Sequence, residues 1–277
     1  MNSTSPQLED VFSREAFDCR FEFRLAGLPP EQLAAAADAA LAEVDRVERL
    51  LSRRDPRSAV SRLNRDARRR LVRVDPELFQ LLVDCGQVGI RTAGHFDLTA
   101  PSRRPEDGPA DGLGSILLDP VRKLVRFSRP TVQLDFGGIE RGYALDRAAL
   151  VLRERGVHQG LLHAGEDLAL ALDGGWKVGL GAPGADSAPL AHVPLRRRAM
   201  ANGRSSAAHP VVRPQSGQAV PDAAACAVIA ASAAQAEALS TTFLSMGRRQ
   251  AGLFCTSGHG AGLQVAWLDQ DLSWLRR

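Results

Sequence analysis

The sequence is poor in lysine, although it is not poor in positive charge. Lys123 and Lys177 are the only lysines in 277 residues, and nearly every other cation is an arginine. Schiff-base catalysis and a Walker-type phosphate loop each depend on a lysine in a defined setting. The scarcity of lysine therefore disfavours both kinds of chemistry.

Closely spaced cysteines and long apolar runs are also missing. No two of the four cysteines have the spacing of a metal site or a redox motif, which predicts free thiols in a reducing compartment. The first twenty residues carry charges where a secretory signal needs an apolar run, and no apolar stretch is long enough to span a bilayer. We expect a cytoplasmic protein without a membrane segment. The cysteines are Cys19, Cys85, Cys226 and Cys255.

Hydrophobic residues make up 44% of the chain, which is enough for a substantial core, and the net charge is only +3. We find no internal repeat and no convincing linker. The sequence predicts an α+β fold with antiparallel or mixed sheets flanked by helices. It also predicts a polar tail over residues 1–14 and a single domain over residues 15–277.

Hydrophobic periodicity and turn residues predict the individual elements. Helices are expected at 29–51, 58–64, 75–93, 143–156 and 233–247. Strands are expected at 17–25, 115–119, 123–128, 132–136, 160–165, 168–172, 176–180, 225–230 and 262–269. The three strands between 115 and 136 have the spacing of an antiparallel meander. The region 184–221 is rich in Pro, Gly and Ser and has weak periodicity.

The stretch "LDFGGIERGYALD", residues 134–146, places two glycines between an apolar segment and an amphipathic helix. Glycines let a ligand approach the backbone, and the first N–H groups of a helix favour an anion. The same pattern is also an ordinary way to join a strand to a helix. From this stretch alone the two interpretations have equal weight.

An arginine-rich segment, residues 52–73, has the charge of a nucleic-acid-binding region. It contains no aromatic residue on which a base would stack, and the charge of the whole chain is near neutral. A solvated helix face is the favoured interpretation, and we expect no nucleic-acid partner.

The stretch "AEALSTTFLSMG" brings oxygen ligands together on a predicted helix. Glu237 and Thr241 are four residues apart and share one helix face, with Ser240 beside Thr241. A carboxylate and hydroxyls suit Mg²⁺, although a lone glutamate on an Ala-rich helix is more often an ordinary surface residue.

Six ordered stretches resemble motifs of the FAD:protein FMN transferase family, the ApbE-type flavin transferases, from about Ala16 to Gly247. "SRRDPRSAVSRLN" is similar to S-x-x-x-P-x-S…N, "GHFDLT" to G-A-F-D-P-T, and "LDFGGIERGYALD" to L-D-L-G-G-I-A-K-G-Y-A-V-D. "LLHAGEDL" resembles N-A-G-G-D-I, "HPVVRPQSGQAV" resembles H-I-I-D-P-R-T-G-x-P-V, and "AEALSTTFLSMG" resembles A-D-A-L-S-T-A-L-F-V-M-G.

This resemblance implies Mg²⁺-dependent transfer of FMN from FAD to a Ser or Thr hydroxyl of a client protein, with release of AMP. His209 would be the general base, because its unperturbed pKa of about 6.5 suits proton transfer. The metal would contact Glu237, Thr241 and the main-chain carbonyl of Glu140, with Ser240 nearby. The flavin nucleotide would contact Phe17, Arg54, His95, Phe96, Asp97, Gly137, Gly138 and Tyr143.

Several positions depart from the family motifs. Phe17, Asp18 and Cys19 replace M-G-T; Arg141 replaces Lys; Glu237 replaces Asp; Ala201, Asn202 and Gly203 replace T-S-G; and Arg213 replaces the Asp of H-I-I-D-P. Arg213 and Ala201 favour an alternative function, in which a catalytically weakened relative binds flavin nucleotide or a partner without transfer. His209, Thr241 and the glycine pair favour the working transferase.

Overall fold

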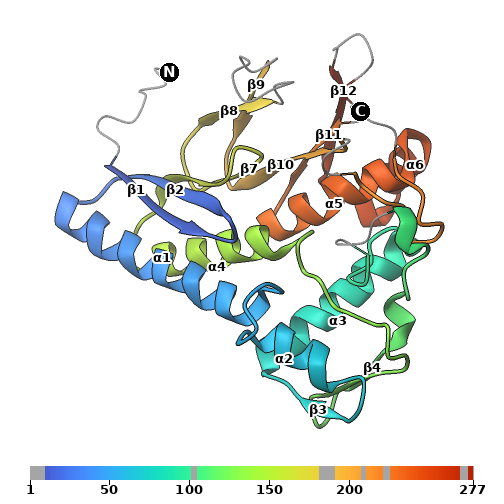
Figure 1. Ribbon diagram of the computed structural model, residues 1–277. Coiled ribbons are helices and arrows are strands. Elements are labelled where there is room, and N and C mark those ends of the chain that lie inside the picture. Colours follow the sequence, from blue (N-terminus) through green and yellow to red (C-terminus); the bar gives the residue numbers. More distant parts are fainter. Residues whose placement is uncertain are drawn as a thin grey trace. The chain divides into compact units, whose positions relative to one another are not determined.

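The structure is a computed structural model that describes residues 10–100, 105–180, 191–206, 210–220, 225–268 and 274–276 (Figure 1). Its internal contacts divide the chain into two units, each assembled from three separate stretches. Unit 1 comprises Met1–Glu48, Ile139–Asn202 and Ala227–Glu237. Unit 2 comprises Arg49–Gly138, Gly203–Cys226 and Ala238–Arg277.

Unit 1 is built on a sheet whose strands follow the order β1-β2-β6-β7-β10-β11, and neighbouring strands from β1 to β10 are antiparallel. A separate two-stranded sheet pairs β8 with β9. The strands are β1 (Asp10–Ala16), β2 (Cys19–Ala26), β6 (Gln159–Ala164), β7 (Leu168–Ala171), β8 (Trp176–Leu180), β9 (Ala191–Leu195), β10 (Arg198–Arg204) and β11 (Ala225–Ala230).

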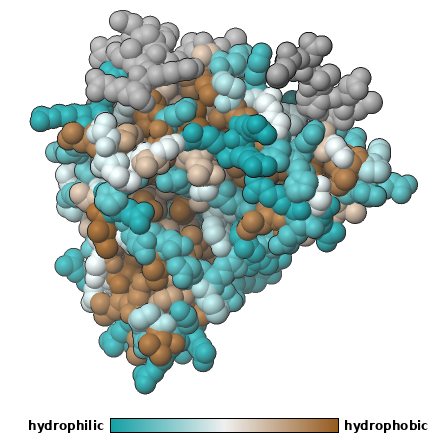
Figure 2. All heavy atoms as spheres, turned by 180° about the vertical axis from the view of Figure 1, so that it is seen from behind, coloured by the Kyte–Doolittle hydropathy of each residue, from teal (hydrophilic) through white to brown (hydrophobic). Residues whose placement is uncertain are grey.

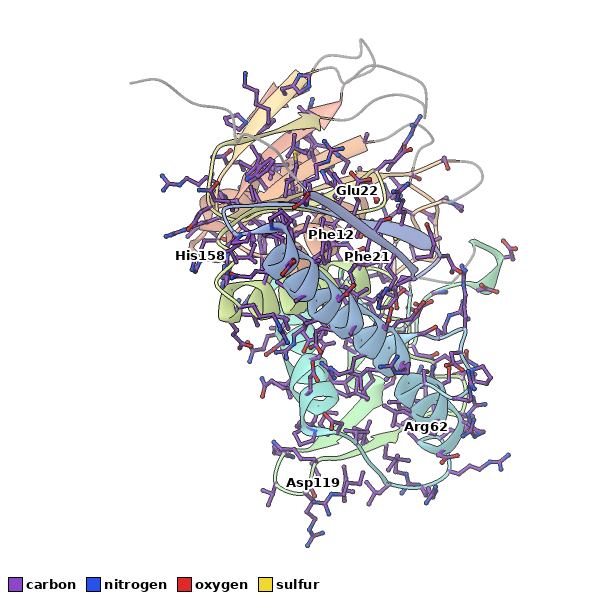
Figure 3. All side chains as sticks on the ribbon, turned by 90° about the vertical axis from the view of Figure 1, so that its left-hand side faces the viewer. Phe12, Phe21, Glu22, Arg62, Asp119 and His158 are labelled. Carbon is purple, nitrogen blue, oxygen red and sulfur yellow. The ribbon has the colours of Figure 1, made fainter. Side chains whose placement is uncertain are left out.

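Strand β2 shows why this sheet forms where the sequence alternates. Phe21, Phe23 and Leu25 are fully buried, whereas Glu22 lies on the opposite face and is partly exposed. Phe21 and Glu22 are labelled in Figure 3. Phe21 pairs with Ala164 of β6, which fixes the register of the central strands.

Two helices, α1 (Pro30–Leu51) and α4 (Glu140–Glu154), lie in unit 1 and are connected by an ion pair. Arg147 of α4 donates to Glu43 of α1 at 3.0 Å. The helix α5 (Ala233–Met246) starts in this unit, and a Cβ on Gly142 would lie 2.4 Å from the carbonyl oxygen of Ala233. Gly142 is therefore needed for the close approach of α4 to the start of α5.

The start of α5 is capped by Ser232, whose hydroxyl accepts the N–H of Gln235 at 3.2 Å, and also by Asp146 of α4. The two carboxylate oxygens of Asp146 accept the main-chain N–H groups of Ala233 and Ala234 at 2.8 and 2.9 Å. These are two of the donors that a helix leaves unsatisfied at its N-terminus. Burial raises the pKa of Asp146 to about 6, although both hydrogen bonds act to lower it.

Unit 2 contains α2 (Ala59–Asp66), α3 (Pro76–Arg91) and α6 (Arg248–Thr256), with short 3-10 helices at Pro105–Asp107, Leu113–Ser115 and Gly258–Gly260. A small antiparallel sheet has the order β3-β5-β4, and β12 pairs with β13. Figure 2 shows hydrophilic residues over much of one face of the molecule and hydrophobic residues reaching its surface toward the lower end. The strands are β3 (Val72–Arg73), β4 (Ile116–Asp119), β5 (Leu124–Phe127), β12 (Gln264–Leu268) and β13 (Trp274–Arg276).

The expected strand at 132–136 does not form, so the predicted meander is wrong. The side-chain amide of Asn64 donates to the carbonyl of Leu134 at 2.8 Å, and its oxygen accepts the N–H of Leu134 at 2.7 Å. The N–H of Asp135 donates to the carbonyl of Leu98. One buried asparagine and a loop thus satisfy backbone groups that a neighbouring strand would otherwise pair. The third strand of the small sheet is β3.

The N-terminal tail expected to reach Arg14 is shorter, because residues 10–14 belong to β1. Asp10 to Ala16 pair with β2 through a two-residue turn at Phe17 and Asp18. The weakly periodic region 184–221, for which the sequence predicted no particular element, contains β9 and β10 in its described part. Their partners lie on β8 and β7, so pairing with distant segments outweighs weak local periodicity.

The α+β prediction is confirmed, since antiparallel sheets are flanked by helices in the described chain. The four cysteines are free, as the sequence predicted. Within the residues described, every helix is too short or too polar to cross a bilayer.

The turn between β1 and β2 gives a testable prediction about backbone strain. Phe17 and Asp18 have φ angles of 51° and 56°, a region that favours glycine. Asp18 stands where the family motif has Gly, so we expect Asp18→Gly to be more stable than Asp18→Ala by about 1 kcal/mol. Chemical denaturation of both variants measures this difference in the free energy of unfolding. Both variants lack the aspartate side chain, so its loss cancels in the comparison. Equal stability of the two variants would contradict a strained turn.

Candidate functional site

Unit 2 contains a pocket of about 170 Å³ that gathers several residues expected to contact the flavin nucleotide. His95, Phe96 and Asp97 line it from the loop after α3, and the glycine pair 137–138 lines it from the segment before α4. Thr241 and Ser245 line it from the second half of α5, and Pro210 to Val212 and Pro214 complete the wall.

His95 is held in this pocket by a serine on α5. Its Nδ1 lies 2.9 Å from the hydroxyl oxygen of Ser245. Burial and the positive charge of Arg213 both lower the pKa of His95. The imidazole is therefore neutral at pH 7, with one nitrogen engaged by Ser245.

Asp97 and Phe96 shape the pocket from a tight turn. The Oδ1 atom of Asp97 accepts the N–H and the hydroxyl of Thr99, each at 2.8 Å. The N–H of Phe96 donates to the hydroxyl of Thr92 at the end of α3. These bonds fix the loop that presents His95, so Asp97 has a clear role in holding the backbone.

The glycine pair lies on an open part of the chain. A Cβ on Gly138 would meet no atom within 4 Å, whereas Gly137 lies close to Asp135, whose Oδ1 atom accepts the Gly137 N–H at 2.9 Å. Asp135 also pairs with Arg53 at 2.9 Å. The backbone of the glycine pair is therefore fixed by Asp135 and accessible from the pocket.

Unit 1 contains a cluster of charged side chains around Arg141, the second residue of α4. The Nε atom of Arg141 donates to Glu237 at 2.8 Å, and its two terminal nitrogens donate to the two oxygens of Asp167 at 2.8 and 2.9 Å. The second oxygen of Glu237 accepts the N–H of Gly142 at 2.8 Å. The Glu237 side chain is only 5% exposed.

Charge and burial in this cluster oppose one another. Burial raises the pKa of Glu237, while Arg141 and the N–H of Gly142 act to lower it. The pKa of Arg141 is raised, because the two carboxylates outweigh the effect of burial. Arg141 thus stays charged and contacts both carboxylates.

The oxygen donors near this cluster fit a hard cation such as Mg²⁺. Asp167 holds Arg141 through a bidentate pair, and Glu237 is a second carboxylate on the same guanidinium. The side-chain oxygen of Asn202 is buried and has no hydrogen-bond partner within the described residues. Asn202 is also joined to Asp167, whose carbonyl accepts its N–H at 2.8 Å. In the ranges described, no three His, Cys, Asp or Glu side chains form a metal cluster, so hydroxyl or carbonyl oxygens would have to complete the coordination.

The remaining expected site residues are distributed over both units. Phe17 is partly exposed at the β1–β2 turn, where its N–H donates to Glu48 at 2.6 Å. Tyr143 lies in the first turn of α4, which Glu140 begins. Arg54 lines a different pocket of unit 2. His209, the expected general base, lies outside the described residues.

Sequence reasoning missed Asp167 and Ser245 as site residues. Asp167 falls in "AGEDL", and its position in a resembled motif was the available signal. Ser245 replaces a valine of the resembled motif, but its importance depends on contact with His95 from 150 positions earlier in the chain. Cys19 was also missed, although it lies beside Arg141, whose charge partly offsets the rise that burial causes in the Cys19 pKa.

The fold is the one seen in solved structures with ApbE in their names. The structure of the ApbE protein from Thermotoga maritima matches with a TM-score of 0.83 at 21% identity, over 97% of each chain. The flavin transferase ApbE from Vibrio cholerae matches with a TM-score of 0.77 at 16% identity, over 98% of this chain and 97% of that one. The apo form of the Pseudomonas stutzeri flavinyl transferase ApbE matches with a TM-score of 0.77 at 19% identity, over 100% of this chain and 97% of the other.

Comparison of the sequence with models of protein families identifies the family of this chain. The model of the ApbE family matches residues 17–104 and 108–265, which is most of the chain. The chain belongs to the ApbE family. No curated protein matches it.

Proposed function

We propose that this protein transfers FMN from FAD to a Ser or Thr hydroxyl of a client protein and releases AMP. The observation that carries the proposal is the match of the ApbE family over residues 17–104 and 108–265. The unit 2 pocket supports it, because His95, Phe96, Asp97 and the open glycine pair line one hollow. Phe17, Tyr143 and Arg54 are proposed as further contacts of the nucleotide.

In the proposed reaction the client hydroxyl oxygen attacks the FMN phosphorus of FAD. The bond between this phosphorus and the bridging oxygen breaks, and AMP leaves with that oxygen. His209 accepts the proton of the hydroxyl, which makes the oxygen a better nucleophile. FMN stays on the client through a phosphoester.

Glu237, Thr241 and the carbonyl of Glu140 are the proposed ligands of Mg²⁺, with Ser240 nearby. A bound Mg²⁺ would neutralise charge that develops on the diphosphate. Arg141 would orient the Glu237 carboxylate through its Nε atom, while Asp167 holds the guanidinium in place. Because these hydrogen bonds of Arg141 already exist before the reaction, the site needs little reorganisation in the transition state. The cytoplasmic location remains a prediction from the sequence.

FAD is expected to raise the melting temperature of this protein more than riboflavin does, and Mg²⁺ is expected to increase the effect of FAD. The physical reason is that a ligand stabilises the folded state by its binding free energy, about 2.7 kcal/mol at a concentration 100 times its Kd. The diphosphate is present in FAD and absent from riboflavin, and it shares its site with the metal. Thermal unfolding with each flavin, with and without Mg²⁺, measures this.

Two variants make the same experiment specific. Glu237→Gln should lose the Mg²⁺ increment, whereas Glu154→Gln, at an exposed position of α4, should keep it. Identical shifts with FAD and riboflavin would contradict a diphosphate site. An FAD shift that does not respond to Mg²⁺ in the parent protein would contradict the shared site.

A further inference from the structure

A second pocket in unit 2, of about 520 Å³, is lined mainly by arginines. It shares no lining residue with the pocket around His95. None of the described residues that line it is acidic or aromatic. We call it the arginine pocket; its walls are Arg53, Arg54, Pro56, Ser61, Asn64, Arg65, Arg68, Arg69 and Gln133.

The backbone under the arginine pocket is held in place by polar side chains. Ser58 caps α2 by accepting the N–H of Ser61, and its hydroxyl also bonds to the carbonyl of Ser52. The hydroxyl of Ser61 donates to the carbonyl of Arg53 at 3.0 Å. Asn64 is buried on the same helix and joined to Leu134. The loop and the helix that carry the arginines are therefore fixed before any partner binds.

Arg68 and Arg69 add positive charge to the pocket without an ion pair among the described residues. Arg53 is paired with Asp135, and Arg68 donates its Nε hydrogen to the carbonyl of Asn64. Arg65 approaches Asp66 only at 3.6 Å. The side chain of Arg69 has no partner among the described residues.

The imbalance extends beyond the pocket. Residues 52–73 contain nine arginines and two aspartates, although the whole chain has a net charge of only +3. Arg62, labelled in Figure 3, projects from the same helix α2 and is exposed. Like charges gathered in one hollow repel each other, so an anionic partner would relieve an unfavourable local interaction.

We propose that the arginine pocket docks an acidic segment of the client protein. The proposal rests on the proposed function, in which the second substrate is a protein. Guanidinium groups bind carboxylates through two parallel hydrogen bonds, and several of them on a fixed backbone match a run of Asp or Glu side chains. A nucleic acid fits less well, because the walls offer no aromatic ring on which its bases stack.

Docking at this pocket would increase the rate of encounter between enzyme and client. A local positive field attracts an acidic segment from a distance of about one Debye length, roughly 10 Å at 0.1 M salt. The interaction would weaken as salt is added. Arg54 lines the arginine pocket and is also a proposed nucleotide contact, so the test substitutes Arg65 and Arg69, which have no proposed role in FAD binding.

The test measures binding of a fluorescein-labelled octaglutamate peptide by anisotropy at low salt. We expect the parent protein to bind it, and we expect the double variant Arg65→Glu/Arg69→Glu to bind it at least about tenfold more weakly, which is 1.4 kcal/mol. Arg65→Lys/Arg69→Lys should retain part of the binding, because the charge remains while the planar fork is lost. The matched control is Arg153→Glu/Arg155→Glu, which changes the same charge at exposed positions at the end of unit 1 helix α4. The control should bind like the parent.

Three results would overturn the proposal. They are no binding of the peptide by the parent, equal losses in the pocket variant and the control, and tighter binding of an octathymidylate than of the peptide. The last result would assign the pocket to nucleic acid. The FAD-induced thermal shift, measured on the same variants, shows that they are folded and reports on the flavin site separately. A normal FAD shift with no peptide binding would reject the docking site and leave the proposed transferase intact.

Discussion

The His209→Ala variant is expected to transfer FMN about 10² to 10⁴ times more slowly than the parent, while its affinity for FAD stays nearly unchanged. This range is typical of the loss of a general base. The motivating observation is the place of His209 in "HPVVRP", which resembles the family motif. AMP release from FAD under single-turnover conditions measures the effect.

His158 supplies a matched control for this variant. It is an exposed histidine of unit 1, labelled in Figure 3, and it lies outside the proposed machinery. His158→Ala should transfer FMN at the parental rate. If His209→Ala also does so, another group accepts the proton, and His95 in the unit 2 pocket becomes the first residue to substitute.

The Arg141→Ala variant is expected to lose about 3 to 5 kcal/mol of folding free energy, the usual cost of breaking a buried ion pair. Its Glu237 carboxylate would remain buried without the guanidinium that balances it. Urea denaturation at pH 8 measures the loss. Arg14→Ala is the control, because it breaks the half-exposed pair with Asp45 and should cost at most about 1 kcal/mol.

The pH dependence of Arg141→Ala follows from the same pair. Without Arg141, burial dominates and raises the pKa of Glu237 above its value in the unfolded chain. A group with a raised pKa contributes stability at low pH and loses it as pH rises through the folded-state value. The variant should therefore be closer to the parent at pH 5.5 than at pH 8. A loss below about 1 kcal/mol at pH 8 would contradict a tightly coupled pair.

Local patterns predicted many elements correctly. The helix α2 begins directly after Ser58, whose hydroxyl caps it by accepting the N–H of Ser61. A serine before a segment with helical periodicity is a usual sign of a helix N-terminus. The alternation in β2 predicted a strand with one buried face, and Phe21 and Phe23 are on that face. These elements depend on neighbouring residues in the sequence, which is why the sequence alone is enough for them.

The elements that were predicted wrongly depend on distant residues. The apolar segment 132–136 has the composition of a strand, but Asn64 binds the backbone of Leu134 from 70 positions away. No local pattern reports this bond. The charged residues of β1 likewise favoured a polar tail in the sequence analysis, whereas pairing with β2 makes this segment a strand.

Departures from the family motifs were visible in the sequence, but their pairing in space was not. Arg141 and Glu237 replace Lys and Asp in two different motifs, and they form one ion pair at 2.8 Å. His95 replaces Ala in a third motif, Ser245 replaces Val in the motif that also contains Glu237, and these two residues share one hydrogen bond. Each substitution appears isolated in the sequence, and only the folded chain shows that the substituted residues contact each other.

The most direct test of the proposed function is the stoichiometry of FAD cleavage. Parent protein, FAD and Mg²⁺ are incubated with a soluble protein extract of the native host, and AMP, free FMN and protein-bound flavin are measured after denaturation. We predict that AMP and protein-bound FMN appear in equal amounts and that neither appears above background with His209→Ala. FAD binding without AMP, or AMP matched by free FMN, would contradict transfer to a client protein.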